Sequence, residues 1–278
     1  MRRTVLIAVS VLLATWLAVP SRAQVDSLSA ARLTGMLDSY YAAMIFEDNS
    51  VKESECDFLI ESCTDSLVRQ FVAYSILEHY MEPPLMGEES VAVYLYEKWF
   101  IHGGVKIADS WDAFQAELFY RTNRLCLLDM PAPVLSVTGV DGDVKTLPAK
   151  GPAVLYFYDI HCSKCKLMTS SLVRQLSKVK FPVTLYAFYA GDDFDGWLAY
   201  REKLNVENAN VSVEHCWDPE MCSDYVTSYA VTTTPRVYFI DENMIIRGRR
   251  LEEDSLGRIL QIYESYCYEK ESIEKEEK

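Results

Sequence analysis

The stretch YFYDIHCSKCKLM, residues Tyr156–Met168, decides the fold. An apolar, aromatic-rich run, Ala153–Tyr158, leads into it and is typical of a buried strand. After it, apolar residues recur at helical spacing as far as Leu176. We therefore expect a strand to deliver Cys162 and Cys165, spaced Cys-x-x-Cys, to the first turn of a helix.

A thiol at the start of a helix is chemically distinct from a free cysteine. The backbone N–H groups and the dipole of a helix N-terminus stabilise negative charge, so we expect the pKa of the Cys162 thiol to fall. The thiolate is the form that attacks disulfides. His161, when protonated, and Lys164 would shift this pKa in the same direction. The sequence therefore predicts a redox-active pair.

Two other interpretations of the pair stay open at this point. The cysteines could form a structural disulfide, or they could supply half of a zinc site. The chain has no second Cys-x-x-Cys, and Cys216 and Cys222 are spaced too widely to resemble one. We therefore expect neither a metal nor a cofactor.

A second stretch, TTTPRVYFIDENMII at Thr232–Ile246, strengthens the redox interpretation. A proline opens a strand, residues 241–243 form a turn, and another strand follows. Together the two stretches resemble the thioredoxin fold, in which a Thr-Pro with a cis peptide bond faces the Cys-x-x-Cys. The resemblance implies that the backbone at Thr234 and Pro235 pairs with a substrate chain.

The first 23 residues have the pattern of a secretory signal peptide. Two arginines precede an apolar run, Val5–Val19, and Ser21-Arg22-Ala23 supplies a small-x-small cleavage site. The apolar run is short for a membrane span, and no later stretch could cross a bilayer. We expect a soluble exported protein located in the periplasm or cell envelope, with a retained N-terminal anchor as the alternative.

The charge of the chain excludes one class of partner. Removal of residues 1–23 takes away three arginines and no acidic residue, which moves the formal charge from -14 to -17. Phosphate backbones and anionic membrane surfaces repel a chain this acidic. We therefore do not expect a nucleic acid as a partner.

Eight cysteines follow the predicted cleavage site, an even number that permits disulfides in an exported protein. The two pairs that are close in sequence, Cys56–Cys63 and Cys216–Cys222, are the local candidates. Six small buried thiols are the alternative, and spacing cannot assign the partners. The six cysteines outside the central pair are Cys56, Cys63, Cys126, Cys216, Cys222 and Cys267.

The predicted organisation is two domains after the signal peptide. Residues 24–129 show apolar residues at three- and four-residue spacing, which predicts an all-α domain with helix starts at Asp65 and Asp109. Two prolines within residues 129–133 mark the boundary. Residues 130–278 are expected to form an α/β thioredoxin-like domain with a central mixed sheet flanked by helices.

The order of elements in the second domain carries a closer resemblance. We expect a hairpin at 134–137 and 144–147, strands at 183–189 and 211–215, and helices at 194–204, 225–229 and 254–268. Asp218 is expected to cap the second of these helices, and residues 269–278 form a charged tail. This layout looks like the TlpA/ResA branch of thioredoxin-like proteins, including exported proteins of Bacteroides-type bacteria with an N-terminal helical domain.

The resemblance implies a thiol–disulfide oxidoreductase. Cys162 would attack a protein disulfide, and Cys165 would resolve the mixed disulfide that forms. The TlpA/ResA likeness favours the reducing direction, with electrons from a membrane-bound thiol donor. A disulfide isomerase or oxidase, and a non-catalytic binding module stapled by the same disulfide, are the alternatives.

Several positions depart from the broader family and leave proton handling open. His161 stands where thioredoxins have tryptophan, and the buried acid of the first central strand falls at Tyr156. The acid that ResA-type proteins carry after the second cysteine falls at Met168, and the helix-kinking proline falls at Ser170. Asp159, His161 and Lys164 are the candidates to take over this role.

Overall fold

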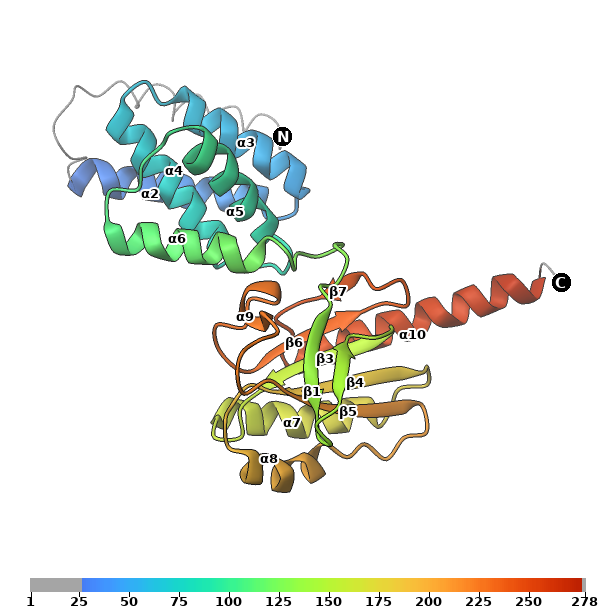
Figure 1. Ribbon diagram of the computed structural model, residues 1–278. Helices are drawn as coiled ribbons and strands as arrows, with labels where there is room; N and C mark the ends of the chain where they lie inside the picture. The colour runs from blue at the N-terminus through green and yellow to red at the C-terminus, as the bar shows by residue number, and fades with distance from the viewer. Residues whose placement is uncertain (1–26, 277–278) are drawn as a thin grey trace. The chain divides into compact units, whose positions relative to one another are not determined.

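The computed structural model describes residues 27–276, with the chain dividing between Arg124 and Leu125 into two compact units (Figure 1). Each unit is described here by itself. The predicted signal peptide, residues 1–23, lies outside the described residues. Within residues 27–276, no helix combines the length and apolar character needed to cross a bilayer.

The first unit consists of helices over its described residues, which confirms the expected all-α part. Aspartates begin two of the helices as the sequence predicted. Asp65 accepts hydrogen bonds from the N–H groups of Leu67 and Val68, and Asp109 caps the last helix in the same way. The elements are α2 (Ser27–Met44), α3 (Asn49–Ser62), α4 (Ser66–Met81), α5 (Glu89–Leu95), the π-helix η1 (Tyr96–His102) and α6 (Ser110–Asn123).

Buried charges join the helices of the first unit to one another. The Lys52 ammonium, 3% exposed, lies 2.6 Å from the Glu88 carboxylate. The Asp57 carboxylate on α3 accepts from the Trp99 indole N–H at 2.7 Å and from the Tyr94 hydroxyl at 2.6 Å. These paired contacts fix the register of α3 against α5 and η1, because a buried carboxylate needs all of its partners.

The second unit is built on one seven-stranded mixed sheet, which confirms the expected α/β class. Its strands lie in the order β2-β1-β5-β4-β3-β6-β7 (Figure 1). The strands are β1 (Leu135–Gly139), β2 (Val144–Leu147), β3 (Ala153–Tyr158), β4 (Val183–Tyr189), β5 (Val211–Trp217), β6 (Arg236–Ile240) and β7 (Ile246–Gly248). The helices are α7 (Ser163–Leu176), α8 (Phe194–Tyr200), the 3₁₀ segment η2 (Arg201–Leu204), α9 (Tyr225–Ser228) and α10 (Glu253–Glu276).

Strand β3 lies at the centre of this sheet. It pairs parallel with β4 and antiparallel with β6, so both of its edges are hydrogen-bonded. Both faces are also covered, and all six of its residues are buried. This explains why the sequence of β3 is continuously apolar and aromatic where a half-exposed strand would alternate. The central position fixes the point at which the chain leaves β3 for the cysteines.

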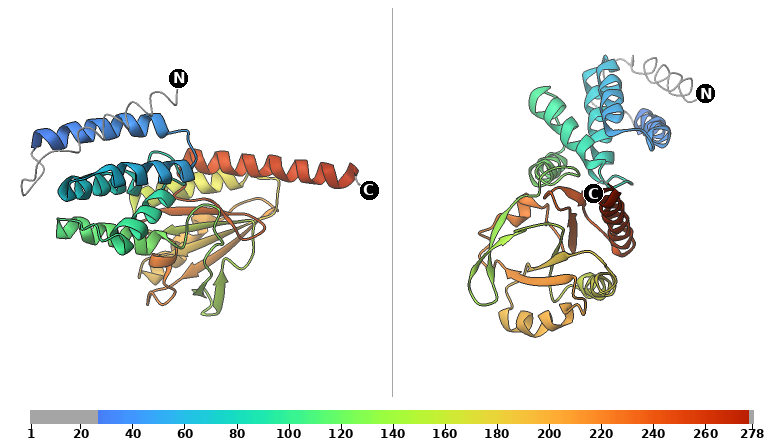
Figure 2. Two further views of the ribbon diagram at one scale, coloured as in Figure 1. Left: turned by 90° about the horizontal axis from the view of Figure 1, so that it is seen from above. Right: turned by 90° about the vertical axis from the view of Figure 1, so that its right-hand side faces the viewer.

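The two faces of the sheet are covered differently. Alternate residues of β3, Val154, Tyr156 and Tyr158, share one core with α7, α8 and α10. Figure 2 shows α7 and α10 side by side. The intervening residues of β3 belong to a second core that includes α9 and the segment before β1. Strand β3 therefore presents Tyr156 and Tyr158 to α7, the helix that begins at Cys162 and carries Cys165.

Three element boundaries differ from the sequence expectation. Asp218 does not cap α9; its carboxylate accepts from the N–H groups of Cys222 and Ser223 and closes the preceding turn. The predicted 194–204 helix changes from α to 3₁₀ geometry after Tyr200. Helix α10 continues to Glu276, so most of the expected charged tail is helical.

Neither local cysteine pair is bonded. Helix α3 continues to Ser62, and the Cys63 Sγ donates to the carbonyl of Leu59, so the turn that would have brought Cys63 back to Cys56 is absent. Cys216 is buried in β5, whereas Cys222 is exposed. Neither candidate disulfide is present, and the alternative of six buried thiols holds for Cys56, Cys63, Cys126 and Cys216 but not for Cys222 or Cys267.

Replacement by alanine should have opposite effects at two glycines. Gly151 precedes β3 and packs against the turn between β6 and β7, whereas Gly35 lies on the exposed face of α2. In Gly151→Ala, the new Cβ would lie 1.8 Å from the Asp241 carbonyl oxygen, a rigid backbone atom. We expect a loss of about 1–3 kcal/mol of stability from this overpacking. Gly35→Ala, on the exposed face of α2 with no atom within 4 Å, should gain roughly 0.5–1 kcal/mol. Urea unfolding measures both, and a neutral Gly151→Ala would contradict this packing.

Candidate thiol–disulfide site

The turn after β3 places the first cysteine. The Asp159 carboxylate accepts from the His161 N–H at 2.6 Å, and the Cys162 N–H donates to the Asp159 carbonyl at 3.3 Å. This compact turn ends directly at α7, of which Cys162 is the N-cap. The predicted strand-to-helix delivery of both cysteines is therefore what the structure contains.

The sulfur of Cys162 takes the role that an oxygen usually has at a helix N-cap. Its Sγ accepts a hydrogen bond from the Cys165 N–H at 3.2 Å. The Sγ also lies 3.5 Å from the carbonyl of Thr234, to which the thiol donates. Burial alone would raise the pKa of Cys162, but hydrogen bonds from Cys165 and from the backbone outweigh it and lower the pKa.

Cys165 has the opposite character. It is fully buried, and this burial raises the pKa of its thiol to about 12. The neighbouring Cys162 adds to the shift, both through their hydrogen bond and through its charge. One turn of helix therefore holds a partly exposed thiol that ionises readily and a buried thiol that stays protonated.

The structure brings the second sequence stretch to the first. The Thr234–Pro235 peptide bond is cis, and both residues are half-buried at the start of β6. The Thr234 carbonyl contacts the Cys162 sulfur across 72 residues of chain. The backbone beside Pro235 thus lies at the reactive sulfur, as the thioredoxin resemblance implied.

The three charged candidates for pKa tuning have other contacts. His161 is 73% exposed in its side chain, and its Nε2 lies 3.5 Å from the Asp193 carboxylate. The Asp159 carboxylate is part of the turn described above. Lys164 is exposed, and it is its backbone N–H that helps to lower the pKa of Cys162.

A set of buried hydroxyls under the site escaped the sequence analysis. The Tyr156 hydroxyl donates to the Cys165 carbonyl at 2.7 Å and lies 3.0 Å from the Thr169 hydroxyl. The Tyr200 hydroxyl donates to Thr169 at 3.1 Å. Only Tyr156 was marked in the sequence, as the position without the family's acid, and nothing local pointed to its partners.

The other two departures from the family are plain in the structure. Met168 is buried in the core that α7 shares with β3 and β4, where it fills space. Ser170 is exposed, and its hydroxyl donates to the Lys166 carbonyl in an unbroken α7. Among the described residues, no group of three or more His, Cys, Asp or Glu side chains is arranged to hold a metal ion.

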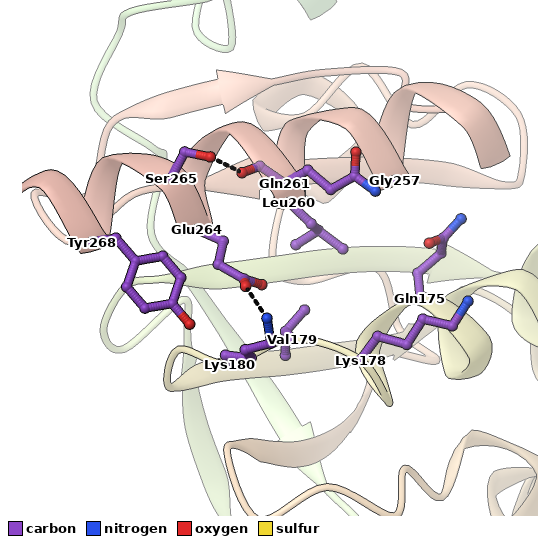
Figure 3. A pocket seen from close by; sticks show the side chains of 10 residues that line it. All are labelled: Gln175, Lys178, Val179, Lys180, Gly257, Leu260, Gln261, Glu264, Ser265 and Tyr268. Carbon is purple, nitrogen blue, oxygen red and sulfur yellow. Dashed lines mark hydrogen bonds and ion pairs between the residues drawn. The ribbon is translucent and has the colours of Figure 1, made fainter.

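An open pocket of about 340 Å³ lies elsewhere in the second unit, between the end of α7 and α10 (Figure 3). Its wall carries an ion pair of 3.1 Å between Lys180 and Glu264, and Leu260 contributes apolar surface. None of the residues predicted for the thiol site lines this pocket. The cysteine pair lies outside it, at the N-terminal end of α7, where Cys162 is partly exposed and Cys165 is buried.

Comparison with known proteins identifies the fold. No protein-family model matches the chain, and no curated protein sequence matches it. A thioredoxin-like protein from Bacteroides caccae matches with a TM-score of 0.54 at 12% identity, covering 88% of this chain and 98% of that one.

Two shorter structures match about half of the chain. One is a domain of a possible thiol-disulfide isomerase from Cytophaga hutchinsonii, with TM-score 0.42 and 25% identity over 52% of this chain and 99% of that one. The other is the thioredoxin domain of a thiol-disulfide oxidoreductase from Bacteroides vulgatus, with TM-score 0.43 and 18% identity over 49% and 96%. The match to the Bacteroides caccae protein, with its TM-score of 0.54, shows that the chain has a thioredoxin-like fold preceded by a helical unit, as the sequence resemblance implied.

Proposed function

We propose that this protein is an exported thiol–disulfide oxidoreductase that acts through Cys162 and Cys165. One observation carries the proposal: a single helical turn holds a partly exposed Cys162 thiol that accepts a hydrogen bond from the Cys165 N–H and a fully buried Cys165 thiol, which shifts their pKa values in opposite directions. A nucleophile and a resolving group need this difference, because only the thiolate attacks a disulfide. We assign the reaction to the proposed thioredoxin-like domain, residues 130–278.

In the first step, the Cys162 thiolate attacks one sulfur of a partner's disulfide. A new S–S bond forms between Cys162 and the partner, the partner's S–S bond breaks, and its second sulfur leaves as a thiolate that takes up a proton. The hydrogen bond from the Cys165 N–H keeps the Cys162 sulfur at the helix tip, where it is partly exposed. The contact to the Thr234 carbonyl belongs to the protonated thiol, because a thiolate has no proton to donate.

In the second step, Cys165 loses its proton and attacks Cys162. The Cys162–Cys165 bond forms and the partner leaves with both of its sulfurs reduced, so two electrons pass from the pair to the partner. The charge of Cys162 contributes to the raised pKa of Cys165. A mixed disulfide carries no such charge, so formation of the intermediate itself makes Cys165 easier to ionise.

The cis-proline backbone is the proposed docking edge for the partner chain. Thr234 and Pro235 are only half-buried, and Thr234 lies beside the Cys162 sulfur. An extended partner segment that pairs with this backbone would present its disulfide to Cys162. We propose protein disulfides as substrates, a membrane-bound thiol protein as electron donor, and the periplasm or cell envelope as location, following the N-terminal sequence and the TlpA/ResA resemblance.

The two thiols should differ in their reaction with iodoacetamide as the pH is varied. Because its pKa is lowered, Cys162 should form its thiolate at a lower pH than an ordinary cysteine does. Its alkylation rate should fall only as the pH drops through this lowered pKa. Cys165 should stay protonated and unmodified until the pH nears its own pKa of about 12. Peptide mass spectrometry measures both, with exposed Cys222 as a reference for reagent access. Equal rates at the two sites would contradict the assignment.

Replacement of the resolving cysteine should trap partners. Cys165→Ser blocks the second step, so mixed disulfides through Cys162 should accumulate in envelope extracts and be identified by mass spectrometry. Cys162→Ser, the matched control, should trap nothing through the remaining thiol, because Cys165 is buried. Reduction of insulin by the parent protein, compared with its refolding of scrambled ribonuclease, separates a reductase from an isomerase. No trapped partner together with no insulin reduction would overturn the proposed function.

A further inference from the structure

A continuous chain of hydroxyls runs beneath the buried cysteine. It consists of Tyr200 on α8, Thr169 on α7 and Tyr156 on β3, and we call these three residues the hydroxyl chain. Its links are 3.1 Å from Tyr200 to Thr169, 3.0 Å between Thr169 and Tyr156, and 2.7 Å from Tyr156 to the Cys165 carbonyl. The chain ends on the backbone of the resolving cysteine.

The direction of the hydrogen bonds in the hydroxyl chain follows from proton counting. Each hydroxyl has one proton to donate. Tyr156 uses its proton on the Cys165 carbonyl, so Thr169 donates to Tyr156, and Tyr200 donates to Thr169. All three bonds therefore point toward Cys165. In such a chain each bond polarises the next, and the terminal contact on the carbonyl is strengthened.

Packing leaves the hydroxyl chain little freedom to rearrange. The ring of Tyr158 stacks on that of Tyr156 at 5.0 Å between centroids and on that of Tyr200 at 5.8 Å. Tyr156 is fully buried, and Thr169 and Tyr200 are 3% and 6% exposed. A buried hydroxyl that lost its partner would have no water to replace it, so the hydrogen-bonded arrangement is strongly preferred.

The hydroxyl chain also stays uncharged. Burial raises the pKa of Tyr156 and of Tyr200 above the ordinary value for tyrosine. Both phenols therefore remain neutral hydrogen-bond donors throughout the pH range in which Cys162 reacts. A buried carboxylate near Cys165 would oppose ionisation of its thiol by charge repulsion, whereas a neutral donor does not.

We propose that the hydroxyl chain is a positioning network that holds Cys165 for its attack on the mixed disulfide. This inference rests on the proposed thiol–disulfide exchange and adds Tyr156, Thr169 and Tyr200 to it. The step itself is the one given above: the Cys165 sulfur, after losing its proton, forms a bond to Cys162 while the Cys162–partner bond breaks and the partner leaves as a thiolate. The network fixes the backbone from which that sulfur is aimed, because reaction rates fall steeply when reacting atoms are misplaced.

Substitutions at Thr169 distinguish the effect of losing its hydroxyl from the effect of changing its packing. Thr169→Val keeps the shape and removes the central hydroxyl, whereas Thr169→Ser keeps the hydroxyl and loses a methyl group. Tyr158→Phe is the matched control: it removes a buried phenol hydroxyl from the same face of β3, but this hydroxyl accepts from the Trp197 indole at 3.0 Å and lies outside the hydroxyl chain.

The test uses the full chain and the aromatic disulfide dithionitrobenzoate. Samples quenched in acid at successive times are analysed by mass spectrometry for protein with the probe on Cys162. The rise of this adduct reports attack by Cys162, and its decay reports resolution by Cys165. We expect Thr169→Val to slow the decay about tenfold without changing the rise, since both buried hydrogen bonds of the Thr169 hydroxyl are lost. In Thr169→Ser and Tyr158→Phe, the decay rate of the adduct should stay within about twofold of that of the parent protein, which is a small change in activation free energy.

Each outcome bears on one proposal. Normal decay in Thr169→Val, or equal slowing in Thr169→Val, Thr169→Ser and Tyr158→Phe, would overturn the positioning role while leaving thiol–disulfide exchange intact. A parent protein that forms no adduct on Cys162, or whose adduct never decays, would overturn the proposed function itself. Tyr156→Phe, which removes the last link, gives an independent second variant and should match Thr169→Val.

Discussion

The hydrogen bond from the Cys165 N–H to the Cys162 sulfur is the interaction on which the site depends. A helix leaves its first backbone N–H groups without partners, and a side chain at the N-cap usually supplies one. Here a sulfur supplies it, so the bond that completes the first turn of α7 also stabilises the thiolate. Strand β3, paired on both edges, fixes where that turn begins. The fold of the second unit therefore sets the hydrogen bonding of the Cys162 sulfur.

Local features of the sequence predicted most of the second unit, and contacts between distant elements account for what was missed. The continuous apolar run of β3 and the helical spacing after Cys165 are properties of short segments, and both were confirmed. The contact between Thr169 and Tyr200 joins helices 31 residues apart, and no spacing rule connects them. The candidate Cys56–Cys63 disulfide is absent because α3 runs as far as Ser62, so Cys56 lies within the helix and Cys63 directly at its end. A helix end is set by a few weak interactions, so sequence places it poorly.

Hydrogen bonding and burial together give the thiols of Cys162 and Cys165 different pKa values. From the sequence, His161 and Lys164 were expected to lower the pKa of Cys162, because charge can be read directly from residue types. Both side chains are exposed, and water and salt screen exposed charges. The contacts that lower the pKa of Cys162 and the burial that raises the pKa of Cys165 lie within the fold, where screening is weak.

The opposite pKa shifts of the two thiols also explain why an uncharged hydrogen-bond network beside Cys165 fits the proposed mechanism. In the proposed mechanism, the buried Cys165 thiol stays protonated until a partner has reacted with Cys162, and it ionises once the mixed disulfide has formed. Burial provides the first condition, and loss of the Cys162 charge favours the second. A fixed negative charge near Cys165 would work against ionisation at the moment it is needed. The aligned hydroxyls of Tyr200, Thr169 and Tyr156 add no charge, yet they satisfy the buried carbonyl and hold the helix turn that carries the sulfur. Formation of the mixed disulfide can then ease ionisation of Cys165 with no opposing charge from the network.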